Sequence, residues 1–290
     1  MADQRKAPVA VVTGAARGIG AGVAERLAKA GYTLSLVGLE GDLLRQKARA
    51  LGGKSIAFEA DVTDRVAMAN AFEGTRERLG SIDVVVSNAG ISNFDLLRTM
   101  SPEHFRRVMA VNVEGTFNAI QVSLPSLIES RGYFLGVASI AAASAPPGMA
   151  AYGASKGAIE NLCNTFRVEV SHLGVDVGVA YFGWLDSDLV RTGNAHQGFK
   201  YVRENLPGPL RAIAPLDVAV NAIVKGIAGR KRVVLAPGWV RLAMALRWML
   251  AGDSSAYKAH MPEIERLCAE ELKARGGTAA SALITDPSNR

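Results

Sequence analysis

Residues 152–156 read Tyr-Gly-Ala-Ser-Lys and place a phenol and an ammonium group four residues apart. The surrounding pattern predicts a helix over residues 152–173, and side chains four apart on a helix share one face. A tyrosine with an ordinary pKa of about 10 is a poor acid or base at neutral pH. A positive charge beside the phenol lowers that pKa, so Tyr152 and Lys156 predict general acid–base catalysis.

A serine precedes this pair at the end of a predicted strand, residues 134–139. Ligands of open parallel sheets bind at the carboxyl ends of the strands, so the Ser139 hydroxyl is placed to donate to a carbonyl oxygen or to hold an alcohol. Each residue alone is unexceptional, since a Tyr-x3-Lys pair is usually a solvated or half-buried helix face. The prediction rests on the conjunction with the features that follow.

A glycine-rich turn, Thr13-Gly14-Ala15-Ala16-Arg17-Gly18-Ile19-Gly20, joins a first apolar strand to a first helix. Glycines allow the backbone to approach a pyrophosphate, and the amides and dipole of a helix N-terminus favour its negative charge. The spacing Gly-x3-Gly-x-Gly differs from the commoner Gly-x-Gly-x-x-Gly, and an ordinary tight turn is the alternative. Its position directly after a buried strand favours dinucleotide binding.

The elements that must position these residues alternate along the chain. Short apolar strands are predicted at residues 9–12, 34–37, 55–58, 83–87, 134–139, 176–181 and 232–235. Helices are predicted between them, at residues 18–30, 42–51, 66–79, 101–130, 152–173 and 217–228. Asp42 is expected to cap the second helix, and Ser101 with Pro102 to begin the fourth. This alternation predicts an α/β fold, a doubly wound, mostly parallel sheet in a single domain.

From about residue 9 to 235 the chain resembles the short-chain dehydrogenase/reductase family, which has a Rossmann-like fold. The resemblance is carried by five motifs in register: the turn at residues 13–20, Asp61-Val62, Asn88-Ala89-Gly90, Asn112 in Val-Asn-Val, and the set Ser139, Tyr152 and Lys156. It implies an NAD(P)-dependent oxidoreductase that interconverts a secondary alcohol and a ketone by hydride transfer, without a metal. Family members are commonly homodimers or homotetramers, and the same is expected here.

The resemblance also assigns roles. Tyr152 exchanges the proton of the substrate oxygen, Lys156 lowers the Tyr152 pKa and holds the nicotinamide ribose, Ser139 binds the substrate oxygen, and Asn112 anchors a water that relays protons to Lys156. The catalytic residues are thus Asn112, Ser139, Tyr152 and Lys156. The expected cofactor contacts are Gly14, Arg17, Gly18, Ile19, Gly20, Asp61, Val62, Asn88, Ala89, Gly90, Tyr152, Lys156, Gly183 and Ser187.

The segment after the sixth strand departs from the family pattern. Phe182 precedes Gly183 where the family usually has proline, so a rigid turn is lost and a backbone N–H is restored. Ser187 keeps a hydroxyl that could hold the nicotinamide carboxamide. The departure raises the alternative of a weakly active protein or of a non-catalytic dinucleotide-binding regulator.

Cofactor choice is read at the end of the second strand. Gly38 stands where an acid would bond the ribose 2′-hydroxyl and repel a 2′-phosphate. Arg17 could bind a 2′-phosphate in a bidentate manner. Leu39 and Glu40 argue the other way, because NADP-preferring relatives often have a basic residue at the former position. The balance favours NADP, with NAD possible and with Arg17 as a solvated turn residue as the alternative.

Composition limits the partners. The formal net charge of +6 suits an anionic cofactor, but no dense basic stripe with aromatics suggests nucleic acid. The two cysteines, Cys163 and Cys268, lack metal-ligand spacing and are expected to be reduced. No secretory signal and no apolar run long enough to span a membrane is evident, so a cytoplasmic protein is expected.

The sequence divides into a catalytic domain, residues 1–236, and a C-terminal helical extension with a tail, residues 237–290. Residues 188–209 are expected to form a loop-rich, mobile lid, in which Phe199, Tyr201 and Leu206 indicate an apolar alcohol or ketone as substrate and His196 is read as a surface residue. The apolar segment Trp239–Leu250 is either a helix on a membrane surface or, the favoured reading, a helix packed on the pocket or across a subunit interface. A polar helix over 263–273 and a frayed tail over 276–290 complete the chain.

Overall fold

The sheet has seven parallel strands. The computed structural model describes residues 7–252 and 255–274, and the tail predicted over 276–290 lies outside them. The strands are β1 (Val9–Thr13), β2 (Thr33–Gly38), β3 (Ile56–Glu59), β4 (Val84–Ser87), β5 (Tyr133–Val137), β6 (Asp176–Phe182) and β7 (Val233–Ala236). Their order is β3-β2-β1-β4-β5-β6-β7, with every neighbouring pair parallel. The order reverses between β1 and β4, which is where doubly wound sheets bind their ligands.

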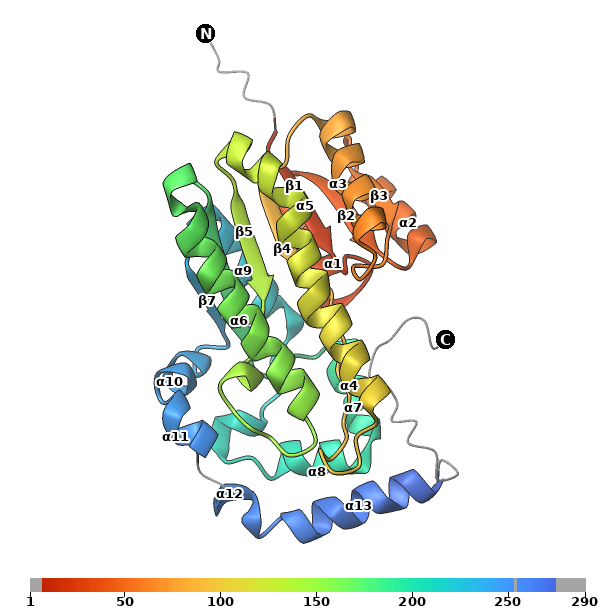
Figure 1. The fold of residues 1–290 in the computed structure, drawn as a ribbon, viewed down its shortest axis with the longest axis vertical. Coiled ribbons are helices and arrows are strands. Elements are labelled where there is room, and N and C mark those ends of the chain that lie inside the picture. Colours follow the sequence, from red (N-terminus) through yellow and green to blue (C-terminus); the bar gives the residue numbers. More distant parts are fainter. Residues whose placement is uncertain (1–6, 253–254, 275–290) are drawn as a thin grey trace.

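Helices cover both faces of this sheet (Figure 1). One face carries α3 (Arg65–Leu79), α4 (Pro102–Met109), α5 (Gly115–Ser130) and α6 (Ala150–Val170), and the other carries α1 (Gly18–Lys29), α2 (Gly41–Leu51) and α9 (Leu216–Ala228). Alternate strand residues face opposite layers: Val11 and Val85 join the first core, and Val12 and Val86 the second. The predicted doubly wound α/β fold in a single domain is confirmed.

Side-chain caps mark the beginning of some of the helices. The Asp64 carboxylate caps α3 by accepting from the amides of Val66 and Ala67, and Ser101 caps α4 ahead of Pro102 as predicted. The expected cap at Asp42 is wrong, because α2 begins one residue earlier at Gly41. Asp42 instead lies in the first turn, where its Oδ1 accepts from Arg45 at 2.8 Å.

The predicted loop-rich lid is helical. It folds into α7 (Asp188–Ala195), α8 (Gln197–Glu204) and a 3-10 turn, Gly208–Arg211, at the carboxyl end of the sheet. Ser187 caps α7 and the His196 ring caps α8. His196 is buried, not on the surface, and its ring packs at a tilt of 57° against Phe94 with the centroids 4.9 Å apart.

The C-terminal extension closes over this lid. Helix α13 (Met261–Ala274), blue along the lower edge of Figure 1, runs beneath α8. Its Ile264 is fully buried in a third apolar core that includes Phe94, Phe199 and Val202. The Tyr201 hydroxyl lies 3.0 Å from Nδ1 of His260, and Arg98 pairs with Glu265 at 2.9 Å.

The segment Trp239–Leu250 is not one helix. It forms α10 (Val240–Ala245) and α11 (Arg247–Gly252), separated at Leu246, and a short α12 (Ser255–Lys258) follows. Within the described part of the chain, the longest apolar helices fall short of what is needed to cross a bilayer.

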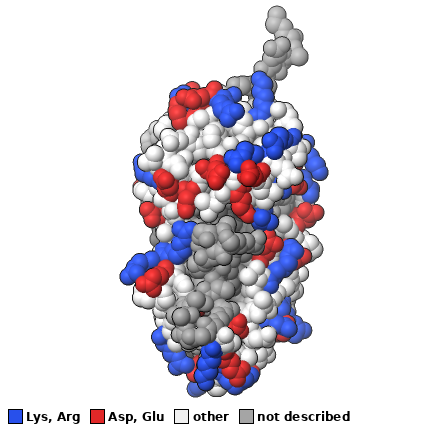
Figure 2. Space-filling model, turned by 90° about the vertical axis from the view of Figure 1, so that its right-hand side faces the viewer, with Lys and Arg blue, Asp and Glu red and all other residues white. Residues whose placement is uncertain are grey.

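Charged side chains are mixed over the surface. On the face seen in Figure 2, Lys and Arg alternate with Asp and Glu and form no field of one sign. Many are paired locally, as in Arg76 with Glu73 and Arg266 with Glu263 and Glu270.

Candidate active site

The glycine turn forms a cradle at the N-terminus of α1. Gly14 and Gly18 have φ of +63° and +54°, a backbone conformation that favours glycine. A methyl group on Gly20 would lie 2.7 Å from Nδ2 of Asn88, so the turn tolerates no side chain there. No side chain caps α1, and the first-turn amides of a helix lack partners within it. These features fit the pyrophosphate of a dinucleotide.

Asn88, predicted as part of the cofactor site, holds this cradle from below. Its Nδ2 donates to the carbonyls of Thr13 and Gly14 at 3.1 and 3.2 Å, and its backbone amide donates to Oγ1 of Thr13 at 3.0 Å. The amide of Ala89 donates to the same hydroxyl at 3.2 Å. The motif at residues 88–90 therefore joins the ends of β4 and β1, and it also lines a cavity beside the glycine turn.

This cavity extends from the glycine turn, and Asp61 and Val62 line it. The Asp61 Oδ1 accepts from the amide and the hydroxyl of Thr63, both at 2.8 Å, which fixes the carboxylate. Arg107 on α4 faces its other oxygen at 3.8 Å and also lines the cavity. Sequence reasoning missed Arg107, because nothing in its local pattern connects it to a residue 46 positions earlier.

The Arg17 guanidinium is half exposed and forms an ion pair with Glu40. Its Nε donates to Oε1 of Glu40 at 2.6 Å, and this carboxylate raises the pKa of the guanidinium. Both residues line the cavity together with Gly38 and Leu39, at the end of β2. The rim that would meet the adenosine ribose thus holds a matched pair of charges.

Asn112 lies in a π-helical turn, Ala110–Glu114, between α4 and α5. Its side chain is fully buried and clamps the loop after β4: Oδ1 accepts from the amide of Ile91 at 2.8 Å, and Nδ2 donates to the Ile91 carbonyl at 2.9 Å. Nδ2 also lies 2.8 Å from Oγ of Ser155 on α6. A π-bulge is a frequent device for aiming a functional residue. Here it ties three elements of the site together.

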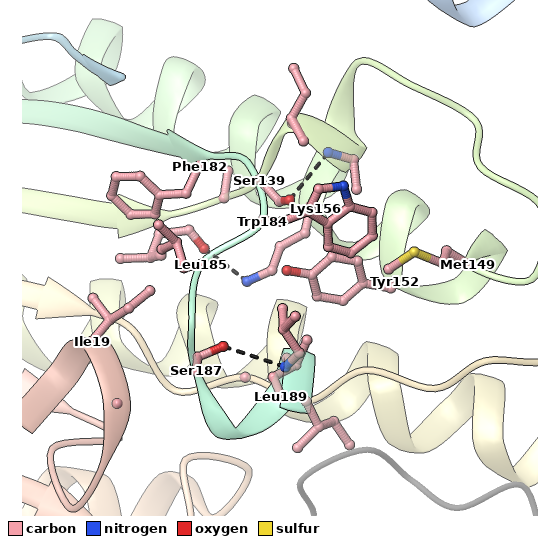
Figure 3. Close-up of a pocket in the computed structure, with 18 of the residues that line it drawn as sticks. Ile19, Ser139, Met149, Tyr152, Lys156, Phe182, Trp184, Leu185, Ser187 and Leu189 are labelled. Carbon is pink, nitrogen blue, oxygen red and sulfur yellow. Dashed lines mark hydrogen bonds between the residues drawn. The ribbon is translucent and has the colours of Figure 1, made fainter. Parts of the chain in front are cut away.

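Tyr152 and Lys156 point into one cavity from α6, with Ser139 and Trp184 beside them (Figure 3). The Lys156 ammonium lies 5.5 Å from the centre of the Tyr152 ring and donates to the Val137 carbonyl at 2.8 Å. Gly90 leaves room for this arrangement, since a methyl group there would lie 3.0 Å from Oδ1 of Asn112 and 3.4 Å from Nζ of Lys156.

The net shift of the Tyr152 pKa is opposite to the expected one, because the pKa is raised and not lowered. Burial raises the pKa of the phenol, and only a hydrogen bond with Ser139 lowers it in part. Burial likewise lowers the pKa of Lys156 to about 8. Removal from water disfavours both charged forms, and this effect exceeds the attraction between them.

Ser139 lies two residues beyond the end of β5, not in the strand as predicted. It caps a 3-10 turn, Ile140–Ala142, and its Oγ accepts from the Ala141 amide at 3.2 Å. The predicted carboxamide partner Ser187 also lines the cavity, and its Oγ accepts from the Val190 amide at 3.5 Å. The structure therefore brings both hydroxyls to the cavity that holds Tyr152 and Lys156.

Phe182, which stands where the family usually has proline, is part of the sheet. Phe182 is the last residue of β6, is buried in the second core and pairs with Ala236 of β7. The next amide, of Gly183, donates to the Ala236 carbonyl at 3.2 Å. Strand pairing thus fixes the segment that a proline would otherwise make rigid.

One cavity of about 450 Å³ runs from the glycine turn to the lid, and it is lined by Gly14, Arg17, Gly18, Glu40, Asp61, Ser139, Tyr152, Lys156 and Ser187. The predicted catalytic residue Asn112 is fully buried and is not among the residues that line it. The charged members of the cavity are Arg17, Glu40, Asp61, Arg107, Lys156 and Asp188. Among described residues, its lid-side wall carries one charge, Asp188 at the start of α7, and otherwise consists of Ser144, Ala145, Pro146, Met149, Trp184, Leu189, Val190, Asn205, Leu206, Pro207, Leu210, Trp239, Met249 and Tyr257. Of the lid residues predicted to indicate an apolar substrate, Leu206 reaches the cavity, whereas Phe199 and Tyr201 pack behind its wall.

Comparison with known proteins agrees with this geometry. The sequence pattern of the family described as short chain dehydrogenase matches residues 8–198. The chain belongs to the short-chain dehydrogenase family. It is therefore an oxidoreductase by family, as the glycine turn and the Tyr-x3-Lys pair predicted.

Individual relatives differ in what they act on. Glycine betaine reductase ATRR of Emericella nidulans is 30% identical over 231 residues, which are 78% of this chain but only 18% of that protein. The 2-(R)-hydroxypropyl-CoM dehydrogenase of Xanthobacter autotrophicus is 35% identical over 191 residues, 63% of this chain and 76% of the relative. A 3-oxoacyl-acyl-carrier-protein reductase of Staphylococcus aureus is 33% identical over 186 residues, 62% and 75%.

Proposed function

We propose that this short-chain dehydrogenase interconverts an apolar secondary alcohol and its ketone, with a nicotinamide dinucleotide as the hydride carrier. The observation that carries the proposal is a single cavity. It holds a glycine cradle at one end and Tyr152, Lys156 and Ser139 at the other. A hydride carrier bound in the cradle supplies or removes the hydride, and the protein supplies orientation and proton transfer.

In ketone reduction, Tyr152 acts as the acid. Its raised pKa keeps the phenol protonated at neutral pH. The hydroxyls of Ser139 and Tyr152 donate to the carbonyl oxygen, and the Tyr152 proton moves onto that oxygen as its negative charge develops. In alcohol oxidation the same phenol oxygen must first be deprotonated and then accept the alcohol proton.

Lys156 stabilises the phenolate that this proton transfer leaves behind. A pKa of about 8 means that the ammonium form predominates at neutral pH, yet a proton can leave it readily. Asn112 acts as a positioning residue, because its bonds to Ile91 and Ser155 hold the loop and the helix on either side of Lys156. The Asn112 carbonyl accepts from Thr116 at 2.7 Å, and its second lone pair can anchor the relay water.

For the cofactor we propose NADP over NAD. Gly38 places no carboxylate against a 2′-phosphate, and Arg17 at the rim offers a cation with fork geometry. Glu40 is the counter-argument, since its carboxylate already bonds Arg17 and would repel a 2′-phosphate. The proposed preference for NADP over NAD is therefore modest, because Glu40 opposes it.

The substrate is proposed to be apolar because most of the lid-side wall is apolar, and its one charge among the described residues is the carboxylate of Asp188. A substrate bearing a phosphate, sulfonate or carboxylate at that end would be desolvated without a partner, which is unfavourable. Apolar ketones of a size that fits the cavity avoid this cost.

The test is a fluorescence titration with NADPH and NADH, followed by a screen of apolar ketones. Binding of NADPH together with ketone-dependent oxidation, abolished in Tyr152→Phe, would support the proposal. If neither nucleotide binds, the proposal is refuted. If nucleotide binds and Tyr152→Phe leaves the biological function unchanged, the rival hypothesis of a non-catalytic dinucleotide-binding regulator takes its place.

A further inference from the structure

The segment that carries α10 and α11 has two unlike faces. Val240 and Ala243 are buried and Met244 packs against the core, so one side of the segment belongs to the protein interior. On the other side Leu242, Leu246, Trp248 and Met249 are exposed, with 82% of Trp248 open to water. We call these four residues the apolar ridge. Neighbouring large apolar side chains left this open usually mark a binding surface.

The apolar ridge lies at the rim of the substrate cavity. Met249 lines the cavity and is also 69% exposed, so it belongs to both surfaces. Leu210 and Tyr257 line the cavity beside it. Figure 1 shows α10 and α11 at the lower left of the molecule, below β7 and next to the lid. Through Met249 the ridge is therefore continuous with the cavity wall.

The exposed cation beside the ridge is Arg241, since the acid Glu160 of α6 pairs with Arg247. No Asp or Glu occurs in the sequence between Asp217 and Asp253. Arg241 is exposed on the outer side of α10, next to Leu242. Arg247 pairs with Glu160 at 2.6 Å and lies 5.6 Å from the Trp248 ring, so it joins the ridge to α6. Tryptophan and arginine beside exposed leucines suit the boundary between lipid headgroups and acyl chains.

We propose that the apolar ridge docks on an anionic lipid surface and that the alcohol or ketone substrate enters from the lipid. A second copy of the chain is the competing occupant. It would cover Met249 and so obstruct the mouth of the cavity, whereas a lipid surface is itself a source of apolar substrate. The largely apolar wall of the cavity and the apolar ridge, with Arg241 beside it, then serve the same ligand. This inference rests on the proposed function for the substrate, but not for the docking.

Co-sedimentation with vesicles tests the docking directly. The full chain is mixed with vesicles of phosphatidylcholine alone and of phosphatidylcholine with an equal part of phosphatidylglycerol. We expect binding to the anionic vesicles that weakens with salt. Leu242→Ser with Trp248→Ser should reduce that binding by about tenfold, because both substitutions remove apolar side chains from the lipid contact.

The matched control is Val66→Ser with Val168→Ser. These valines are 69% and 74% exposed, on α3 and α6, away from the ridge. The control should bind vesicles as the unmodified chain does. Equal binding by the control and by the ridge variant would overturn the proposal, as would absence of binding to either vesicle. A far-UV circular dichroism melt of each variant checks that folding is retained, and quenching of Trp248 by brominated lipid in the folded full chain provides a second readout.

Light scattering and turnover separate the remaining outcomes. If the unmodified chain forms dimers that Leu242→Ser with Trp248→Ser breaks, and vesicles do not bind, the ridge is a subunit interface and the proposal fails. Turnover with a water-soluble ketone is measured apart from vesicles. If turnover is absent while ridge-dependent binding is present, the proposed function fails and the docking stands. If the ridge variant reduces soluble ketone normally but reduces vesicle-embedded ketone poorly, both stand.

Discussion

Gly183 lies so close to the indole of Trp239 that a methyl group on Gly183 would be 2.5 Å from Cζ2 of that ring. Gly183 follows β6, whereas Trp239 follows β7 and precedes α10. The missing side chain allows the tryptophan to form part of the cavity wall. The C-terminal extension is therefore built into the site and does not merely follow the catalytic domain.

Replacing Gly183 by alanine should displace Trp239. We expect the free energy of unfolding to fall by about 1–3 kcal/mol, as for other overpacked sites, and the KM for the ketone to rise. Urea unfolding and steady-state kinetics measure the two effects. Gly238→Ala is the control, because a methyl group there meets nothing within 4 Å. Equal behaviour of the two variants would contradict the packing argument.

The pH dependence of ketone reduction should follow Lys156. Its pKa is lowered to about 8, so the ammonium is present below that pH and is lost as the pH rises through it. Because the ammonium stabilises the phenolate formed in reduction, kcat/KM for the ketone should decline above about pH 8. The decline is measured from stopped-flow or steady-state rates between about pH 6 and about pH 10. Tyr152→Phe should be slower by at least about 100-fold and should lack this profile, whereas a profile shared by both proteins would exclude Tyr152 as the acid.

The buried ammonium of Lys156 should also lower the free energy of unfolding of the protein. Its folded pKa lies below the ordinary value of 10.5, so the cost is present at neutral pH, where Lys156 is protonated in both states, and is relieved as the pH rises from about 8 toward 10.5. Lys156→Met should therefore lose turnover while the free energy of unfolding at pH 7 rises by about 1–3 kcal/mol. A chemical-denaturation curve decides the sign. A clear loss of stability would mean that the hydrogen bond from Lys156 to Val137 outweighs the desolvation of the ammonium.

Cofactor preference should respond to Arg17 and Glu40 in opposite directions. Glu40→Gln removes the carboxylate that bonds Arg17, so NADPH should bind about tenfold more tightly while NADH changes little. Arg17→Ala should weaken NADPH by a similar factor. Fluorescence titrations of the four protein–nucleotide pairs measure this. Tighter NADH binding in Arg17→Ala, with NADPH unchanged, would refute the assignment of NADP.

Helix α13 should hold the lid in place. Ile264 is fully buried in the third core beneath α8, so Ile264→Ala should lower the free energy of unfolding by about 2–4 kcal/mol and raise the KM for the ketone. Hydrogen exchange of residues 197–204 should become faster in the variant. Lys258→Ala, at an exposed position, serves as control. Unchanged exchange in Ile264→Ala would show that α8 is stable without α13.

The sequence by itself determined the order of elements and the family. Short apolar runs alternating with amphipathic helices can be buried in few ways, so the parallel sheet followed from local patterns. The Tyr152–Lys156 spacing and the turn at residues 13–20 are local as well, because one helix face and one strand–helix junction fix them. Errors at this level were small: α2 begins at Gly41 instead of after a cap at Asp42, and Ser139 lies beyond β5.

Only the tertiary structure decided features that depend on residues far apart in the chain. The pairing of Arg17 with Glu40, the contact of Gly183 with Trp239 and the burial of His196 join segments whose local patterns carry no sign of one another. The direction of the Tyr152 pKa shift also depends on residues far apart in the chain. Desolvation is a property of everything packed around a group, so the charge of a neighbour four residues away could not predict it.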